Sequence, residues 1–109
     1  MPYISDPIMD NKPTYKLWLE GYSRNPRRKF KSVGSYINYI GLIEKDLGMA
    51  KDGIYRLKNI ARLRKLEIDL RKAPKFKRRK PKRRYNLMSA LHYYRNLVQV
   101  LAGKNRQEL

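Results

Sequence analysis

Apolar residues recur at the spacing of a helical face in four segments of this chain, and no other feature constrains its fold as strongly. The clearest segment is 33–47, which is followed directly by a glycine. Ser32 is expected to cap the start of this helix. Gly48 is expected to end it, because glycine readily adopts the left-handed conformation found just after a helix. The apolar stripe of the segment comprises Val33, Tyr36, Ile37, Ile40, Ile43 and Leu47.

Three further segments show the same periodicity. Thr14 is expected to cap the first helix, Asn59 to cap the third helix before Pro74 closes it, and Asn86 to cap a fourth helix that ends at Gly103. Their apolar faces comprise Tyr15, Trp18, Leu19 and Tyr22, then Ile60, Leu63, Leu66 and Leu70 together with Glu67, then Leu87, Ala90, Leu91, Tyr94, Val98 and Leu101. Because amphipathic helices bury such faces against one another, the sequence predicts an all-α fold, a small four-helix bundle.

The predicted helices divide the chain into one domain with two short ends. Residues 1–13, which contain three prolines, are expected to form an irregular N-terminal arm. Residues 14–103 are expected to form the helical domain, and residues 104–109 a C-terminal tail. Gly34 and Gly41 lie inside the second helix, where each costs about 1 kcal/mol relative to alanine. We interpret both as positions where a neighbouring helix packs closely.

The most basic stretch of the chain lies between the third and fourth predicted helices, where eight of the ten residues from 75 to 84 are Lys or Arg. Because a helix is expected on either side, residues 74–85 are predicted to form a long basic surface loop whose two ends are held. Charge runs are often simply solvated, but eight neighbouring cations repel one another strongly unless a counter-charge is bound. A second basic cluster precedes the helix at 33–47 and comprises Arg24, Arg27, Arg28, Lys29 and Lys31.

The overall charge indicates the kind of partner, because Lys and Arg total 27 against 9 Asp and Glu, a formal net charge of +18. Self-repulsion of this size destabilises a small folded domain, and a bound polyanion relieves it. Nucleic acid is the first candidate and an anionic membrane surface the second. The chain contains no cysteine, its apolar runs are too short to cross a membrane, and its start lacks the pattern of a secretory signal. We therefore expect an intracellular protein, cytoplasmic or nucleoid-associated, without integral membrane association.

Between residues 14 and 103 the motifs follow a particular order. An aromatic-Leu pair, Trp18-Leu19, lies in the first helix, and after a loop the second helix opens with a Ser- and Tyr-containing turn, KSVGSYI, at residues 31–37. The later helices read DGIYRLKNIARLRKLEIDLRK and NLMSALHYYRNLVQVLAG. This order resembles the core-binding, or SAM-like, N-terminal domain of tyrosine recombinases and phage integrases.

In that family the domain forms half of a clamp around duplex DNA and faces the major groove and the phosphates. The resemblance therefore implies a SAM-like fold and a DNA-binding module. Two features depart from the family pattern, because the connection between the third and fourth helices is longer and more basic, and the large catalytic domain that normally follows is absent. We interpret the chain either as a stand-alone relative, such as a regulator from a mobile element, or as the amino-terminal domain of a longer protein.

The residues expected to contact DNA come from the two basic segments and from the start of the second helix. They are Lys77, Arg78, Arg79, Lys80, Lys82, Arg83 and Arg84, then Arg27, Arg28, Lys29 and Lys31, with Ser35 and Asn38 as polar contacts. Most of these side chains are expected to bind phosphates. Since arginine can bind phosphate or guanine through two parallel hydrogen bonds, base reading is expected from the arginines.

No catalytic function is expected. His92 and Arg95 have the His-x-x-Arg spacing of the recombinase active-site box, but that box belongs to the absent domain and its other members have no matching context here. The single histidine, the lack of cysteine and the lack of a glycine-rich phosphate loop argue against common metal and nucleotide sites, so we expect no cofactor. Two pairs of acids spaced two apart point to different sides of their helices and are expected to pair with Lys or Arg. They are Glu44 and Asp46, and Glu67 and Asp69.

The aromatic residues leave the type of nucleic acid open. Several lie among or beside cations, where they either stack on the bases of a single strand or pack against the bundle. They are Phe30, Tyr55, Phe76, Tyr85 and Tyr93. Double-stranded DNA is the preferred partner, and two alternatives share the same charge. The first is a small phage-type inhibitor or adaptor that binds a nucleoprotein complex, and the second is an RNA-binding protein.

Overall fold

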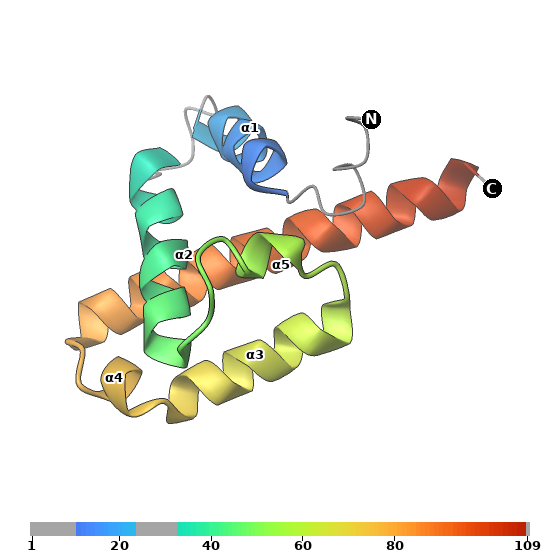
Figure 1. Ribbon diagram of the computed structural model, residues 1–109. Helices are drawn as coiled ribbons and strands as arrows, with labels where there is room; N and C mark the ends of the chain where they lie inside the picture. Colours follow the sequence, from blue (N-terminus) through green and yellow to red (C-terminus); the bar gives the residue numbers. More distant parts are fainter. Residues whose placement is uncertain (1–10, 24–32, 109) are drawn as a thin grey trace, which may run out of the picture.

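The computed structural model describes residues 11–23 and 33–108, with side chains for residues 11–21 and 33–103, and every regular element in these ranges is helical (Figure 1). The elements are α1 (Lys12–Ser23), α2 (Val33–Leu47), the 3₁₀ turn η2 (Ile54–Arg56), α3 (Ile60–Lys72), α4 (Pro74–Lys77) and α5 (Pro81–Glu108). The predicted all-α fold is therefore confirmed. Among the helices described, none combines the length and the apolar character that crossing a membrane requires.

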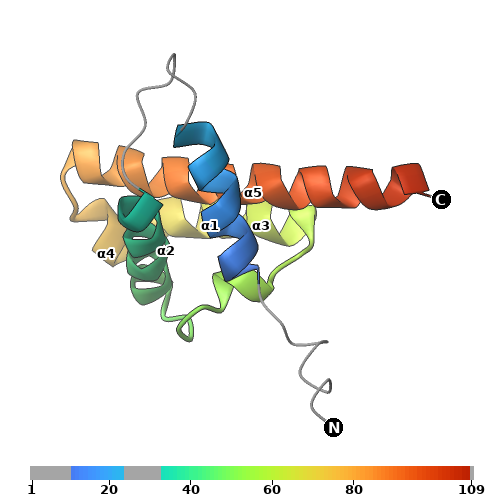
Figure 2. The ribbon, with the colours of Figure 1, turned by 90° about the horizontal axis from the view of Figure 1, so that it is seen from above.

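The long helix α5 is the element on which the others pack. α2 crosses its N-terminal part, α3 runs beside it, and α1 contacts both α2 and α5 (Figures 1 and 2). The short helix α4 joins α3 to α5 at one end of the molecule, where it also contacts α2. At the other end, α5 projects beyond the remaining helices (Figure 2).

The core contains the apolar faces that the sequence periodicity indicates. Every described helix contributes to it, as does the turn η2. Its fully buried large side chains are Tyr15, Leu19, Ile40, Ile43, Ile54, Tyr55, Leu63, Leu70, Leu87, Leu91 and Tyr94. The predicted stripes of α2, α3 and α5 thus point inward, including Glu67, which is buried on the same face of α3.

Three tyrosines from distant parts of the chain meet in this core. The rings of Tyr15 and Tyr94 lie edge to face with centroids 5.5 Å apart, and Tyr55 lies 5.6 Å from Tyr94. The hydroxyls of Tyr15 and Tyr94 bond to backbone, since Tyr15 donates to the carbonyl of Ala90 at 2.8 Å and the Tyr94 hydroxyl lies 2.9 Å from the carbonyls of Tyr55 and Leu57. Burial raises the pKa of Tyr15, because a phenolate would be desolvated there.

Two predicted helix ends are confirmed in atomic detail. Gly48 has φ 69°, and the N–H groups of Gly48 and Met49 donate to the carbonyls of Lys45 and Glu44, which is the hydrogen-bond pattern of a glycine-terminated helix. The Asn59 side chain accepts a hydrogen bond from the backbone N–H of Arg62 at 3.1 Å and so caps α3. Ser32 lies outside the described residues.

Three other predicted helix ends are wrong. α1 begins at Lys12 rather than after Thr14, and the Tyr15 N–H donates to the carbonyl of Asn11 at 2.8 Å. α5 begins at Pro81 instead of Asn86, because proline fits a first helical turn, where no N–H is needed. It also continues through Gly103 to Glu108, since one glycine costs a helix only about 1 kcal/mol.

The predicted basic loop at 74–85 is also wrong, because α4 and the first turn of α5 occupy most of it. Most of the backbone in this range therefore has regular helical hydrogen bonds where the sequence suggested an irregular segment.

A second correction concerns the glycines of α2. A Cβ added at Gly41 would meet nothing within 4 Å, so no neighbouring helix packs closely there, and Gly34 is exposed.

The carboxylate of Glu44 organises the connection between α2 and α3. It is buried, and it accepts hydrogen bonds from the backbone N–H groups of Asp52 at 3.0 Å and Ile54 at 3.1 Å. Burial raises the pKa of Glu44, while the two N–H donors act in the opposite direction. The sequence predicted a Lys or Arg partner for this acid, but its hydrogen-bond partners are backbone groups of the following turn.

Replacing Glu44 by Gln should destabilise the fold, because an amide offers one acceptor oxygen and turns an NH₂ group toward the second backbone N–H. The expected loss is about 1–3 kcal/mol, the usual cost of an unsatisfied buried group. Thermal unfolding followed by circular dichroism measures it. Asp69→Asn removes an exposed carboxylate and serves as the control, with an unchanged melting temperature. Equal melting temperatures for Glu44→Gln and the native chain would show that the two hydrogen bonds are not needed.

Candidate nucleic-acid interface

The basic run folds into a helical corner that connects α3 to α5. α4 is held by Phe76, which is buried in the core, and by backbone hydrogen bonds from Lys77 to Ala73 and from Arg78 to Pro74. At the start of α5, the N–H of Arg84 donates to the carbonyl of Lys80 at 3.0 Å. The cations of this run are therefore carried on ordered backbone.

Arg79 anchors this corner to α2. Its Nε and Nη2 atoms each donate to one oxygen of Asp46, both at 2.8 Å, in a two-pronged ion pair. The Asp46 side chain is 1% exposed and that of Arg79 is 25% exposed. The hydrogen bond to Asp46 raises the pKa of Arg79. In the structure its guanidinium holds the link between α4 and α5 against α2, and the side chain also lines the first depression described below. The role of Arg79 as a DNA contact stays a prediction.

Arg83 occupies a defined position on the first turn of α5. Its guanidinium carbon lies 5.7 Å from the centroid of the Tyr39 ring, within the range of a cation–π contact. The Tyr39 hydroxyl in turn accepts from the buried amide of Asn86 at 3.4 Å. Beside it, Nη1 of Arg84 lies 3.4 Å from the carbonyl of Lys77. The positions of both arginines are thus restricted by contacts with the scaffold.

Two depressions meet at Arg83 and form one surface. The first, of about 600 Å³, is lined by Leu42, Asp46, Lys75, Arg78, Arg79, Lys80 and Arg83. The second, of about 530 Å³, is lined by Ser35, Asn38, Tyr39, Gly41, Leu42, Lys45 and Arg83. Apart from the Asp46–Arg79 ion pair and Tyr39, we call the polar side chains that line them the corner surface, which comprises Ser35, Asn38, Lys45, Lys75, Arg78, Lys80 and Arg83.

The corner surface brings together two groups of residues that the sequence analysis named separately. Ser35 and Asn38 of α2 join Arg78, Lys80 and Arg83 of the basic run. The predicted Lys77, Lys82 and Arg84 belong to the same corner of the chain but line neither depression. The predicted Arg27, Arg28, Lys29 and Lys31 lie outside the described residues.

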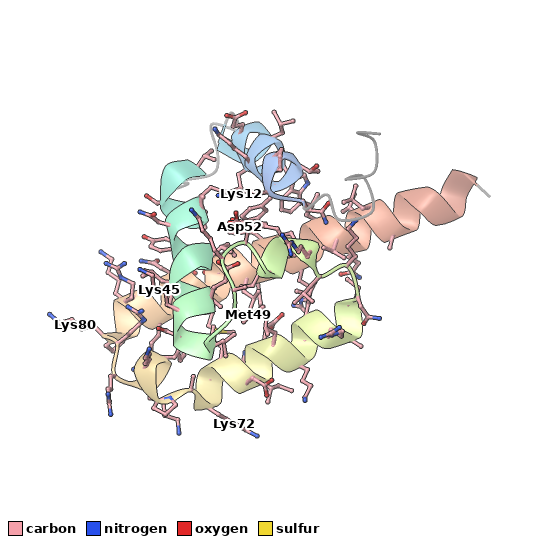
Figure 3. The ribbon with its side chains drawn as sticks, in the orientation of Figure 1. Lys12, Lys45, Met49, Asp52, Lys72 and Lys80 are labelled. Atoms are coloured by element: carbon pink, nitrogen blue, oxygen red, sulfur yellow. The ribbon has the colours of Figure 1, made fainter. Side chains whose placement is uncertain are left out.

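The sequence analysis missed Lys45 and Lys75. Figure 3 shows Lys45 and Lys80 on the same side of the molecule, among nitrogen-tipped side chains. A signal for Lys45 was available, because Ser35, Asn38 and Lys45 follow one another at the spacing of one helical face. For Lys75, only the position of α4 beside α2 decides which cations of the run line the surface.

His92 and Arg95 lie on α5 and contact α3. Nε2 of His92 is 2.9 Å from one oxygen of Glu67, and Nε of Arg95 is 3.0 Å from the other, although this second pair is not aligned as a hydrogen bond. The Glu67 side chain is only 7% exposed. Arg95 is therefore the cationic partner of a buried acid between α3 and α5, and His92 contacts the same acid. Within the described part of the chain, no three metal-ligating side chains gather.

Most of the aromatic residues beside cations pack into the fold. Tyr55 and Phe76 are buried, and the Tyr93 ring lies 5.6 Å from Tyr36. Tyr85 differs, because it is 72% exposed on the first turns of α5. Phe30 lies outside the described residues. Among the side chains that the structure describes, Tyr85 is thus the one exposed aromatic residue.

Comparisons of the chain with protein-family models, curated proteins and solved structures found no match. The resemblance to the core-binding domain of tyrosine recombinases therefore stays a prediction. A functional assignment depends on the geometry and charge of the corner surface.

Replacing Arg79 by Gln should lower the stability of the fold, because the buried carboxylate of Asp46 loses its ionic partner. A loss of at least about 1–3 kcal/mol is expected, because the Asp46 side chain is only 1% exposed and an unpaired buried charge costs no less than an unpaired buried polar group. The matched control is Arg78→Gln, which removes the exposed neighbouring cation and should leave the melting temperature level or slightly higher. Urea unfolding of the two variants measures the difference, and equal midpoints would mean that Arg79 does not anchor the corner.

Proposed function

We propose that this chain binds duplex DNA, mainly through the phosphates, and that the corner surface is the contact. The observation that carries the proposal is the charge on this surface. Its five cations are exposed and, among the residues that the structure describes, none forms an ion pair with a carboxylate, while Asp46, the acid beside them, is paired with Arg79. They are Lys45, Lys75, Arg78, Lys80 and Arg83. A surface of this kind has a strong positive potential that favours a polyanion.

The scaffold beneath these cations supports tight binding of phosphates. The Asp46–Arg79 pair and Phe76 hold α4 in place, and the ring of Tyr39 lies under Arg83. Side chains carried on ordered backbone lose less conformational freedom on binding than those of a flexible loop. The N-terminal end of α5, at Pro81, adds the partial positive charge of a helix dipole to the same region.

The placement of the aromatic residues favours duplex over single-stranded nucleic acid. Proteins that bind single strands without sequence preference use several exposed aromatic rings to stack on successive bases. Here, among the described side chains, Tyr85 alone is exposed, and the other aromatic rings are buried or half-buried. Ser35 and Asn38, which also line the surface, supply neutral donors and acceptors for phosphate or base edges.

This proposal agrees with the resemblance to integrase core-binding domains, in which the corresponding module grips duplex DNA. The chain would then act as a stand-alone relative from a mobile element or as the DNA-binding part of a longer protein. RNA and a nucleoprotein complex carry the same phosphate charge, so they are the alternatives that a binding experiment must separate.

The test is a titration of the chain against matched duplex DNA, single-stranded DNA and duplex RNA at several salt concentrations. Duplex DNA should bind most tightly, and log affinity should fall with log salt by about 0.9 per phosphate contact. A corner variant, Lys75→Gln, Arg78→Gln, Lys80→Gln and Arg83→Gln, should weaken binding to all sequences and flatten the slope by up to about four contacts' worth.

The control must remove the same charge elsewhere. Lys16→Gln, Lys51→Gln, Arg56→Gln and Lys58→Gln take four exposed cations from outside the corner surface, so net charge falls equally in both variants. Binding by this control should change much less. If both variants weaken binding equally, the corner surface is not a specific contact. Tighter binding of duplex RNA or of single strands would replace duplex DNA as the partner.

A further inference from the structure

The outer face of α3 carries a second set of cations that does not line the corner surface. Arg64, Lys65, Arg71 and Lys72 are all exposed and follow the spacing of one helical face, with Ile68, 49% exposed, between them. We call these five residues the α3 ridge. Two turns of helix separate Arg64 from Arg71 and Lys65 from Lys72, a rise of about 10.5 Å.

The contacts of α3 with the core fix the position of the ridge. The inward face of α3 buries Leu63 and Leu70 in the core, and the carboxylate of Glu67 is bound by His92 and Arg95 of α5. Within the described ranges, the side chains of the ridge cations form none of the ion pairs that hold the acids. Asp69 lies on the same helix, and it is the one exposed carboxylate among the described side chains.

The α3 ridge and the corner surface face in different directions. In Figure 3, Lys72 points outward from the lower edge of the molecule, along which α3 runs. Lys45 and Lys80 lie at the left side, where α2 and the start of α5 meet. The two cationic surfaces therefore face different directions on either side of the turn at α4, where Lys72 of the ridge and Lys75 of the corner surface are three residues apart.

A stiff duplex fits one of these surfaces at a time. DNA has a persistence length of about 150 base pairs, and bending a site of 20–30 base pairs by 40–90° costs on the order of 1–6 kcal/mol. A duplex that lies on the corner surface would need such a bend to reach the ridge. The ridge thus stays available to another segment, and the net charge of +18 offsets the repulsion between two duplexes.

We infer that the α3 ridge binds a second segment of duplex DNA, so that one copy of the chain bridges two duplexes. This inference rests on the proposed function of the corner surface. The ridge supplies phosphate contacts from its four cations, and Ile68 supplies an apolar contact to the sugars between them. Such a protein brings together two DNA segments rather than simply coating one.

The experiment tests whether the chain, once bound to one duplex, captures a second. One short duplex is fixed to beads, the full chain is added, unbound protein is washed away, and a labelled second duplex is supplied. The native chain should retain the label. A ridge variant, Arg64→Gln, Lys65→Gln, Arg71→Gln and Lys72→Gln, should still bind to the bead-held duplex but lose capture of the labelled one. The control variant at Lys16, Lys51, Arg56 and Lys58 loses the same charge but keeps the ridge, so it should still capture the labelled duplex.

Self-association would also capture a second duplex, so a mixing step separates the two explanations. Ridge and corner variants are combined on the beads. If bridging takes place within one copy, the mixture should not retain the labelled duplex. Capture by the mixture, or capture by the ridge variant alone, would overturn the inference. So would a ridge variant whose only defect is weaker binding to vesicles of phosphatidylserine, because the ridge would then face a lipid surface.

The outcomes distinguish this inference from the proposed function. If the native chain binds the bead-held duplex but never captures the second, only the bridging role fails. If it does not bind the first duplex at all, the proposed function fails as well. In saturating titrations with short duplexes, the native chain should take up two per copy and the ridge variant one.

Discussion

The ion pair between Asp46 and Arg79 is the interaction on which the arrangement of the corner surface depends. It joins the last turn of α2 to the short link between α4 and α5, two segments far apart in the sequence. Because its geometry is two-pronged, with both distances at 2.8 Å, it fixes direction as well as distance. Without it, cations that repel one another would have little reason to gather beside α2. One arginine of the run thus holds its neighbours in place.

Throughout the described part of the chain, buried acids form contacts within the fold while most cations lie on the surface. Glu44, Asp46 and Glu67 are buried. Asp46 binds a guanidinium and Glu67 contacts a histidine and an arginine from distant parts of the chain, whereas Glu44 binds backbone N–H groups of the turn that follows α2. The few acids therefore stabilise contacts between helices, and most cations remain on the surface. This arrangement reconciles a folded core with a net charge of +18, because repulsion is confined to groups that water can screen.

Local patterns in the sequence predicted some features well and others badly. The apolar stripe of α2, its end at Gly48 and the cap at Asn59 were all correct, because each depends on residues within one or two helical turns. The basic run was predicted to form a loop, because one helix was expected to close at Pro74 and the next to begin at Asn86. What the local pattern missed is that Pro74 and Pro81 each stand in a first helical turn, where proline is favoured, and that Phe76 and Arg79 provide long-range anchors.

The sequence by itself determined that the fold is helical, which faces are apolar, and that an excess of positive charge must lie outside. Helical periodicity and charge are properties of neighbouring residues, so no tertiary contact is needed to recognise them. Only the tertiary structure decided which cations share a surface. Ser35 and Asn38 meet the basic run, Arg79 turns inward, and the cations of α3 face elsewhere because α2, α4 and α5 pack at one corner through contacts between distant residues. Those contacts depend on the shape and pairing of particular side chains, which spacing along the chain does not encode.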